Sequence, residues 1–220
     1  MPLEIERKYL HPDLTRLRQR LPLGGAMLKQ RAWEENLVLD TPARIMRQTN
    51  MLLRLRHAGT TTLTLKKPVT GSADGRNVKT MEELETMVAD KTAMLAIFKH
   101  LGFMIAFKYE KFRETWQWKN CTICLDILPF MEAVELEGDL GCIDEAEQYF
   151  GLNSLEASTL TYHQLHQLHC QNLGLPPTDD FVFSPEQKAL IATSISSAEE
   201  KTSPSSQQYR EKPTTDKKIY

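Results

Sequence analysis

The sequence has no long apolar run. No stretch of its 220 residues approaches the roughly 20 consecutive apolar residues that a membrane-spanning helix needs. The first residues, MPLEIERKYLHPDL, carry charges where a secretion signal has its apolar segment, so we expect no signal peptide. From these absences we expect a cytoplasmic protein without a membrane partner.

Cysteine is also scarce. The four residues Cys121, Cys124, Cys142 and Cys170 are too few for a disulfide scaffold in a chain of this length. Cys121 and Cys124 have the spacing of a redox or zinc motif, but residues three apart on a strand lie on opposite faces. Because no second pair follows, we interpret both as inert.

Neither sign of charge is in excess. Lys and Arg together number 27 and Asp and Glu number 29, which gives a formal net charge of -2. Proteins that bind nucleic acid non-specifically are usually basic, so we expect no nucleic-acid partner. A hydrophobic content of 41% and a charged content of 25% are typical of globular domains and exclude wholesale disorder. Any functional charge is therefore local.

Alternation of polar and apolar residues with a period of two is the main pattern present, and it is typical of half-buried β-strands. It occurs in residues 2–10, 34–40, 51–57, 61–67, 79–86, 105–118, 121–128 and 132–137. Helices are expected at residues 13–21, 89–101, 143–150 and 155–172. The order of these elements predicts an α+β fold.

The C-terminal part differs in composition. From Pro176 the chain reads as an extension, with a short helix expected at 184–192 and few apolar residues from 194 onward. We expect one compact domain over residues 1–172, followed by an extension over residues 173–220 that is mostly flexible.

Six of the predicted strands carry charged doublets opposite an apolar row. For any one strand the simplest interpretation is a face exposed to water. Six strands with same-sign doublets favour another interpretation, because like charges on one face repel and need opposite charges nearby. A closed barrel with its charged face inward meets this need. The residues concerned are Glu4, Glu6, Lys8, Arg54, Arg56, Lys66, Glu83, Glu85, Lys111, Arg113, Glu135 and Glu137.

The charges of this expected lumen balance, with six acids and six bases. Two divalent cations would add four positive charges, and a free triphosphate carries roughly four to five negative charges near neutral pH. Arg and Lys suit phosphate oxygens, and Glu oxygens suit Mg²⁺ or Mn²⁺. The pattern favours phosphoryl chemistry, which needs positioning and charge stabilisation rather than a nucleophilic side chain.

The motifs resemble those of the CYTH superfamily, the triphosphate tunnel metalloenzymes. Residues Glu4 to Lys8 match its Glu-x-Glu-x-Lys signature. The later motifs follow in the family's order: LRLR at 53–56, TLTLK at 62–66, Glu-x-Glu at 83–85, Lys-x-Arg at 111–113, Leu-Asp at 125–126 and Glu-x-Glu-Gly at 135–138. The resemblance covers about residues 1–170. It implies an eight-stranded antiparallel β-barrel that forms a triphosphate tunnel, with flanking helices, over residues 1–172.

The resemblance also implies a role for each motif residue. The implied metal ligands are Glu4, Glu6, Asp126, Glu135 and Glu137, and the implied phosphate-binding residues are Lys8, Arg54, Arg56, Lys66, Lys111 and Arg113. Glu83 and Glu85 form a supporting acidic pair. The expected catalytic residues are Glu4, Glu6 and Lys8, where a neutral Lys8 amine would help to deprotonate the attacking water.

Three functions stay open at this point. The favoured one is Mg²⁺- or Mn²⁺-dependent hydrolysis of a small-molecule triphosphate, most simply inorganic tripolyphosphate to pyrophosphate and phosphate. The second is a class IV type adenylate cyclase, although no sequence feature specifies an adenine pocket. The third is a binding module for polyphosphate or nucleotides, against which the full set of carboxylates argues. A homodimer through the outer face also stays open.

Two further features bear on the site. Members of the family that hydrolyse thiamine triphosphate often carry an aromatic residue where this chain has Leu39, which counts against that substrate. His163, His166 and His169 recur at three-residue spacing on an expected helix. Because they drift around the helix rather than stack on one face, we interpret them as a solvated helix edge.

Overall fold

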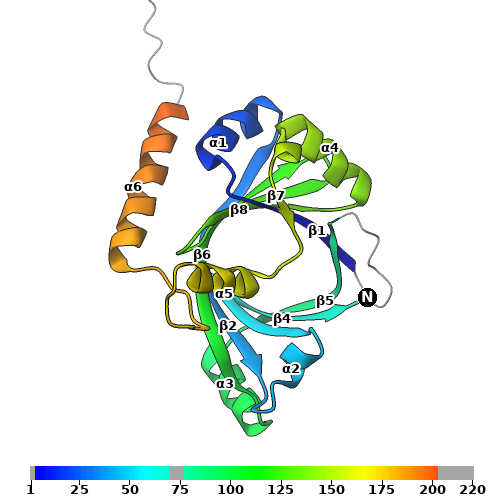
Figure 1. The fold of residues 1–220 in the computed structure, drawn as a ribbon, viewed down its shortest axis with the longest axis vertical. Helices are drawn as coiled ribbons and strands as arrows, with labels where there is room; N and C mark the ends of the chain where they lie inside the picture. The colour runs from blue at the N-terminus through cyan, green and yellow to red at the C-terminus, as the bar shows by residue number, and fades with distance from the viewer. Residues whose placement is uncertain (1–2, 70–76, 203–220) are drawn as a thin grey trace, which may run out of the picture. The chain divides into compact units, whose positions relative to one another are not determined.

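The computed structural model describes residues 3–69 and 77–202. Within them, eight antiparallel strands form a ring with helices outside it (Figure 1). The strands are β1 (Leu3–Leu10), β2 (Met27–Asp40), β3 (Leu52–Ala58), β4 (Thr60–Pro68), β5 (Lys79–Val88), β6 (Met104–Trp118), β7 (Cys121–Ile127) and β8 (Glu132–Glu137). This arrangement confirms the predicted α+β fold with an antiparallel tunnel sheet.

The ring closes through the first strand. The sheet order is β5-β4-β3-β2-β6-β7-β8-β1, and a further pairing between β1 and β5 joins its ends. That pairing covers only Leu3 to Glu6 of β1. Beyond it, Lys8 and Tyr9 pair with the short strand β9 (Ala157–Ser158). The C-terminal part of the chain therefore completes the wall next to the Glu-x-Glu-x-Lys motif.

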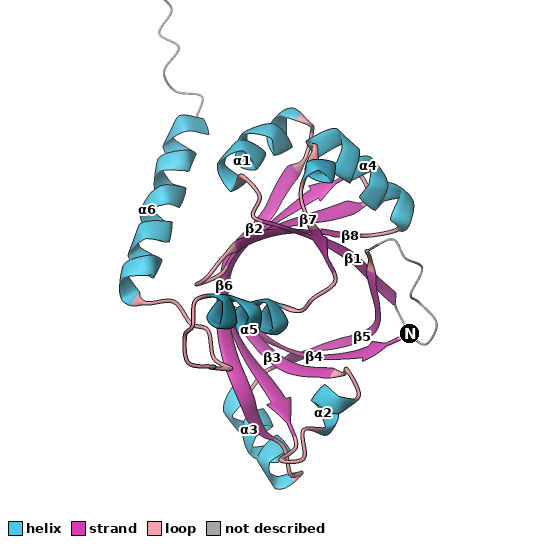
Figure 2. Ribbon diagram, in the orientation of Figure 1, coloured by secondary structure: helices cyan, strands magenta, loops and turns pink. Residues whose placement is uncertain are grey.

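Helices α1 (Leu14–Leu23), α2 (Ile45–Gln48), α3 (Lys91–His100) and α4 (Leu140–Phe150) cover the apolar outer face of the ring (Figure 2). A 3₁₀ turn follows at Leu152–Ser154, and helix α5 (Tyr162–Asn172) lies at one end of the ring, where Tyr162 and His163 line its interior. The largest core lies between α1, α4 and the outward side chains of neighbouring strands, and it includes Leu21, Ile143 and Trp118. Trp118 also donates a hydrogen bond through Nε1 to the carbonyl of Gly24 at 2.8 Å.

Three elements differ from the prediction. The helix expected at 155–172 begins only at Tyr162, because residues 157–158 pair with β1 and Thr161 caps the helix. The second strand begins at Met27 rather than at residue 34, since it pairs with β6 over most of its length. Helix α2 was not predicted, and the carboxylate of Asp40 holds it by accepting hydrogen bonds from the amides of Met46 and Arg47.

The chain continues to pack on the ring beyond residue 172. Phe181 forms a bridge with Tyr109, and its amide donates to the carbonyl of Lys108 at 3.2 Å. The compact unit ends at Phe183, and a second unit starts at Ser184.

In the second unit, helix α6 (Pro185–Thr202) runs past the expected end at residue 192, through a segment with helix-forming Ala, Glu and Lys residues. The flexibility expected for residues 203–220 lies outside the described residues. Among the described helices, none has the length and apolar character that crossing a membrane requires.

Candidate active site

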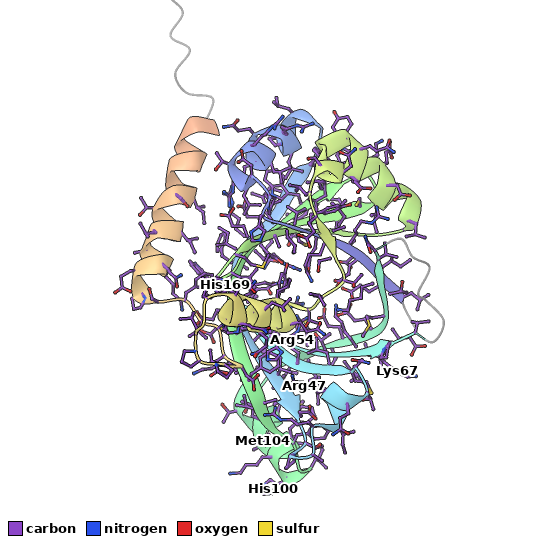
Figure 3. All side chains as sticks on the ribbon, viewed as in Figure 1. Arg47, Arg54, Lys67, His100, Met104 and His169 are labelled. Atoms are coloured by element: carbon purple, nitrogen blue, oxygen red, sulfur yellow. The ribbon has the colours of Figure 1, made fainter. Side chains whose placement is uncertain are left out.

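The ring encloses a cavity of about 760 Å³. Its lining includes all twelve charged residues that the alternating pattern places on the inward face, among them Glu4, Lys8, Arg54 and Glu135. Figure 3 shows side chains filling the interior of the ring, with Arg54 labelled at its edge. The sheet therefore turns its charged face inward and its apolar face toward the helices.

The predicted glutamates and the arginines of this lumen come from different strands. The three adjoining strands β5, β1 and β8 form an acidic arc that carries the six predicted glutamates: Glu83, Glu85, Glu4, Glu6, Glu135 and Glu137. The arginines form a basic arc on the opposite strands, with Arg54 and Arg56 on β3 and Arg113 on β6. The two arcs meet inside the cavity, where Arg56 pairs with Glu85 at 2.9 Å and Arg113 pairs with Glu135. The cavity thus presents ligands suited to cations beside donors suited to anions.

The acidic arc concentrates negative charge. Burial, together with the neighbouring Glu6 and Glu83, raises the pKa of Glu4 to about 7, although Lys66 forms an ion pair with it. Burial likewise raises the pKa of Glu137. Glu6 and Glu137 lie opposite each other in the β1–β8 register. The ionised forms of these carboxylates would therefore be stabilised by an additional positive charge.

A divalent metal would supply that charge. Among the described residues, no three His, Cys, Asp or Glu side chains already converge as a metal site. Lysines neutralise part of the carboxylate charge instead. Lys66 forms an ion pair with Glu4, and Lys79 Nζ lies 3.4 Å from Glu6. The donor chemistry nevertheless fits Mg²⁺ or Mn²⁺, because Glu4, Glu6 and Glu137 present carboxylate oxygens from adjoining strands to one cavity.

The basic arc is held by a buried hydrogen-bond network. Arg54 donates to the hydroxyl of Tyr109 at 3.2 Å and to the hydroxyl of Thr64 at 3.4 Å. Arg113 pairs with Glu135, whose pKa stays well below its ordinary value because Lys8 and Arg113 outweigh the effect of burial. These contacts fix the cations in place before any ligand arrives, which favours binding of phosphate oxygens.

Asp126, implied as a metal ligand, does not reach the cavity. Its side chain has no exposed surface. It accepts hydrogen bonds from Arg113 Nε at 2.6 Å, from Lys111 Nζ at 3.2 Å and from the hydroxyl of Tyr162 at 2.7 Å. With both oxygens engaged, this carboxylate holds the two cations that do line the cavity.

Several lining or neighbouring residues were missed by the sequence analysis. Lys79 shares a strand face with Glu83 and lines the acidic arc. Glu34 is 5% exposed and lies 3.5 Å from Lys111. Neither belongs to a charged doublet, because the residues two positions away on the same face are uncharged: Met81 follows Lys79, and Ala32 and Asn36 flank Glu34. The period of two would have found Lys79, because it stands four residues before Glu83.

One end of the cavity is apolar and aromatic. Leu52 and Phe107 line it together with His163, whose ring lies 4.4 Å from that of Phe107. His163 Nε2 is 2.8 Å from Asp179. The predicted solvated histidine edge is therefore wrong, since His163 is 13% exposed and His166 is buried. The cause is that α5 packs against aromatic side chains, including Phe130.

The closed antiparallel ring and its charged cavity together define the class of protein as a tunnel enzyme fold. A model of the CYTH domain matches residues 2–161. The chain belongs to the CYTH domain family, whose members are in general metal-dependent tunnel enzymes that often act on triphosphates.

Individual relatives agree with this assignment. A candidate adenylate cyclase of Methanocaldococcus jannaschii is 27% identical over 148 residues, which is 66% of this chain and 82% of that protein. The solved structure of a candidate adenylate cyclase from Vibrio parahaemolyticus has a TM-score of 0.62 at 16% identity, over 74% of this chain and 97% of that chain. A candidate adenylyl cyclase from Hippeastrum, described as having a dominant triphosphatase activity, has a TM-score of 0.55 at 17% identity, over 81% and 99% of the two chains.

Proposed function

We propose that this protein is a divalent-metal-dependent hydrolase of a triphosphate, most simply of inorganic tripolyphosphate, which it converts to pyrophosphate and phosphate. The observation that carries the proposal is that one cavity holds both a glutamate-rich arc and an arginine-rich arc. A metal–triphosphate complex has the matching charges on its two sides. The triphosphatase activity described for the Hippeastrum relative supports the same reaction class.

Different residues of the cavity bind the phosphate groups and the metal. Arg54, Arg56 and Arg113 bind the phosphate oxygens and stabilise the charge that develops on them during transfer. Glu4, Glu6 and Glu137 would hold the metal, which supplies charge neutralisation and acidifies water when bound. Because the ring holds both arcs rigidly, the attacking water and the phosphoryl group are positioned without a nucleophilic side chain.

The contacts of Lys8 suit a role in binding phosphate. Its Nζ donates to the carbonyl of Leu160 at 2.9 Å and lies 3.3 Å from Glu135. Both contacts hold the amine as a hydrogen-bond donor. We therefore assign Lys8 to phosphate binding rather than to deprotonation of the attacking water.

A second candidate, an adenylate cyclase acting on ATP, is favoured by the apolar end of the cavity. Leu52, Phe107 and His163 offer room for an organic ring beyond the charged groups. The volume of about 760 Å³ lies within the range of about 300–1,000 Å³ that is usual for organic ligands. Product analysis with ATP separates the candidates, because a cyclase releases cyclic AMP and pyrophosphate whereas a hydrolase releases ADP and phosphate.

Replacing Glu4 by Gln tests the role of the acidic arc. Glu4→Gln should lower phosphate release from tripolyphosphate about 100-fold, since the neutral amide is a poor ligand for a hard cation. The ring should stay folded, because Lys66 keeps Glu83 as a partner at 3.6 Å. Glu145→Gln, on the exposed surface of α4, is the matched control and should retain activity. Normal turnover by folded Glu4→Gln protein would contradict the assignment.

A further inference from the structure

Tyr162, the first residue of α5, connects the C-terminal segment to the charged lumen. Its ring lines the cavity, and its hydroxyl donates to Asp126 Oδ2 at 2.7 Å. Burial and the carboxylates of Asp126 and Glu135 keep the pKa of Tyr162 well above its ordinary value. The Tyr162 hydroxyl therefore keeps its proton in the hydrogen bond to Asp126 and does not donate it to a substrate.

The same carboxylate oxygen serves two cations. Asp126 Oδ2 accepts from Lys111 Nζ at 3.2 Å and also from Arg113, while Oδ1 accepts from Arg113 Nε at 2.6 Å. Lys111 and Arg113 line the cavity, whereas Asp126 lies behind them. The Tyr162 hydroxyl donates to the oxygen that Lys111 and Arg113 share, and so helps to fix the position of Asp126.

The ring of Tyr162 contacts two lysines directly. Lys8 Nζ lies 4.3 Å from the ring centroid, and Lys111 Nζ lies 5.5 Å from it. Both distances are within the range in which an aromatic face attracts a cation. The carbonyl of Leu160, two residues before Tyr162, accepts from Lys8 at 2.9 Å. One short turn therefore holds the lysine of the N-terminal motif from two directions.

That turn is itself fixed at both ends. On one side, β9 pairs with β1 at Lys8 and Tyr9, so the turn and Lys8 share one register. On the other side, Thr161 and Gln164 form reciprocal capping hydrogen bonds at the start of α5. The turn has little freedom to move relative to Lys8, which is the property that a positioning element needs.

We propose that Tyr162 is a positioning residue for substrate binding, holding Lys8 through its ring and Lys111 and Arg113 through its hydrogen bond to Asp126. The proposal rests on the proposed function, because it takes these cations as the groups that bind phosphate oxygens. It also gives the C-terminal segment a part in the tunnel that a peripheral helix would not have.

The kinetic test compares Tyr162→Phe, which loses the hydroxyl, with Tyr162→Leu, which loses the ring as well. With tripolyphosphate and Mg²⁺, KM should rise about 10-fold in the first variant and about 100-fold in the second, while kcat changes little. Tyr149→Phe, a half-exposed tyrosine on α4 packed against Trp118, is the control and should match the wild type. A fall in kcat with unchanged KM would show that binding of the triphosphate does not depend on Tyr162 and would overturn the proposal.

A second measurement needs no activity and so separates this proposal from the proposed function. In the ligand-free protein, the ring current of Tyr162 should shift the NMR signals of the Lys8 ε-methylene protons. The shift should persist in Tyr162→Phe and disappear in Tyr162→Leu. A wild type that neither binds nor hydrolyses triphosphates would contradict the proposed function. A Lys8 signal that does not move in Tyr162→Leu would overturn the positioning role in either case.

Discussion

Glu34 illustrates, at the scale of single residues, how the lumen stabilises charge away from water. Its carboxylate lies 3.5 Å from Lys111 and 3.9 Å from Arg56. Burial disfavours the ionised form, but Lys111 and the nearby arginines outweigh it and lower the pKa of Glu34 to about 2. The glutamate in turn compensates cations that would otherwise repel each other across the basic arc.

Glu34→Gln should therefore destabilise the fold in a pH-dependent way. The folded pKa of about 2 lies below the ordinary value of 4.5, so the stabilisation is complete above pH 4.5 and is lost as the pH falls toward 2. At pH 7 the free energy of unfolding should drop by about 3 kcal/mol. Urea unfolding at several pH values checks this, and the difference from the wild type should shrink below pH 4.5.

Glu35→Gln is the matched control for that experiment. Glu35 is exposed and lies 3.7 Å from Lys91, so its loss should change the stability by less than about 1 kcal/mol. A deficit of Glu34→Gln that stays constant from pH 7 to pH 3 would show that packing, and not charge, is responsible.

Alternation along the strands was enough to predict which charged residues face the lumen. It could not show how they pair, because pairing depends on contacts between strands that are distant in the sequence. Asp126 is the clearest case: its motif resembles a ligand position, but Arg113, Lys111 and Tyr162 engage both of its oxygens and bury it. Lys79 and Glu34 were missed because neither has a second charge two residues away on its face.

Helix α5 is the element that the sequence located least well. Its apolar periodicity extends upstream of Tyr162, which favoured a helix from residue 155. The pairing of Ala157 and Ser158 with β1 is a long-range contact that overrides this local preference. The capping box of Thr161 and Gln164 then fixes the helix start, and with it the position of Tyr162.

Thr161→Ala should weaken this element measurably. Loss of an N-cap side chain costs about 1 kcal/mol, which corresponds to a decrease of about 2–4 °C in Tm for a chain of this size. Thr193→Ala, at an exposed position in α6, removes the same atoms without a cap and is the control. Thermal unfolding followed by circular dichroism gives the comparison. Equal Tm values for the two variants would argue against the role of the cap.

At the scale of the whole molecule, the first strand and residues 157–183 both contribute to the tunnel wall. β1 closes the ring by pairing with β5, and the rest of the same edge pairs with β9. The segment that ends at Phe183 pairs with the edge of β6 through Phe181. The sequence predicted a charged tunnel of eight strands, but these closures depend on pairings between distant segments that no local pattern encodes. They explain why residues beyond 172 belong to the compact unit.

The polarity of the lumen is the property of the whole molecule on which the proposed function depends. Neither arc alone distinguishes an enzyme from a binding module: arginines bind phosphate without chemistry, and carboxylates bind metals without substrate. Their placement on opposite strands of one ring favours a metal and a triphosphate bound side by side.

The most direct test is phosphate release and product identity from tripolyphosphate, ATP, GTP and thiamine triphosphate, each with Mg²⁺ and Mn²⁺. We expect release of phosphate and pyrophosphate from tripolyphosphate, dependent on the metal and abolished by a chelator. Cyclic AMP from ATP without hydrolysis of tripolyphosphate would contradict it, as would tight binding of tripolyphosphate without turnover under either metal.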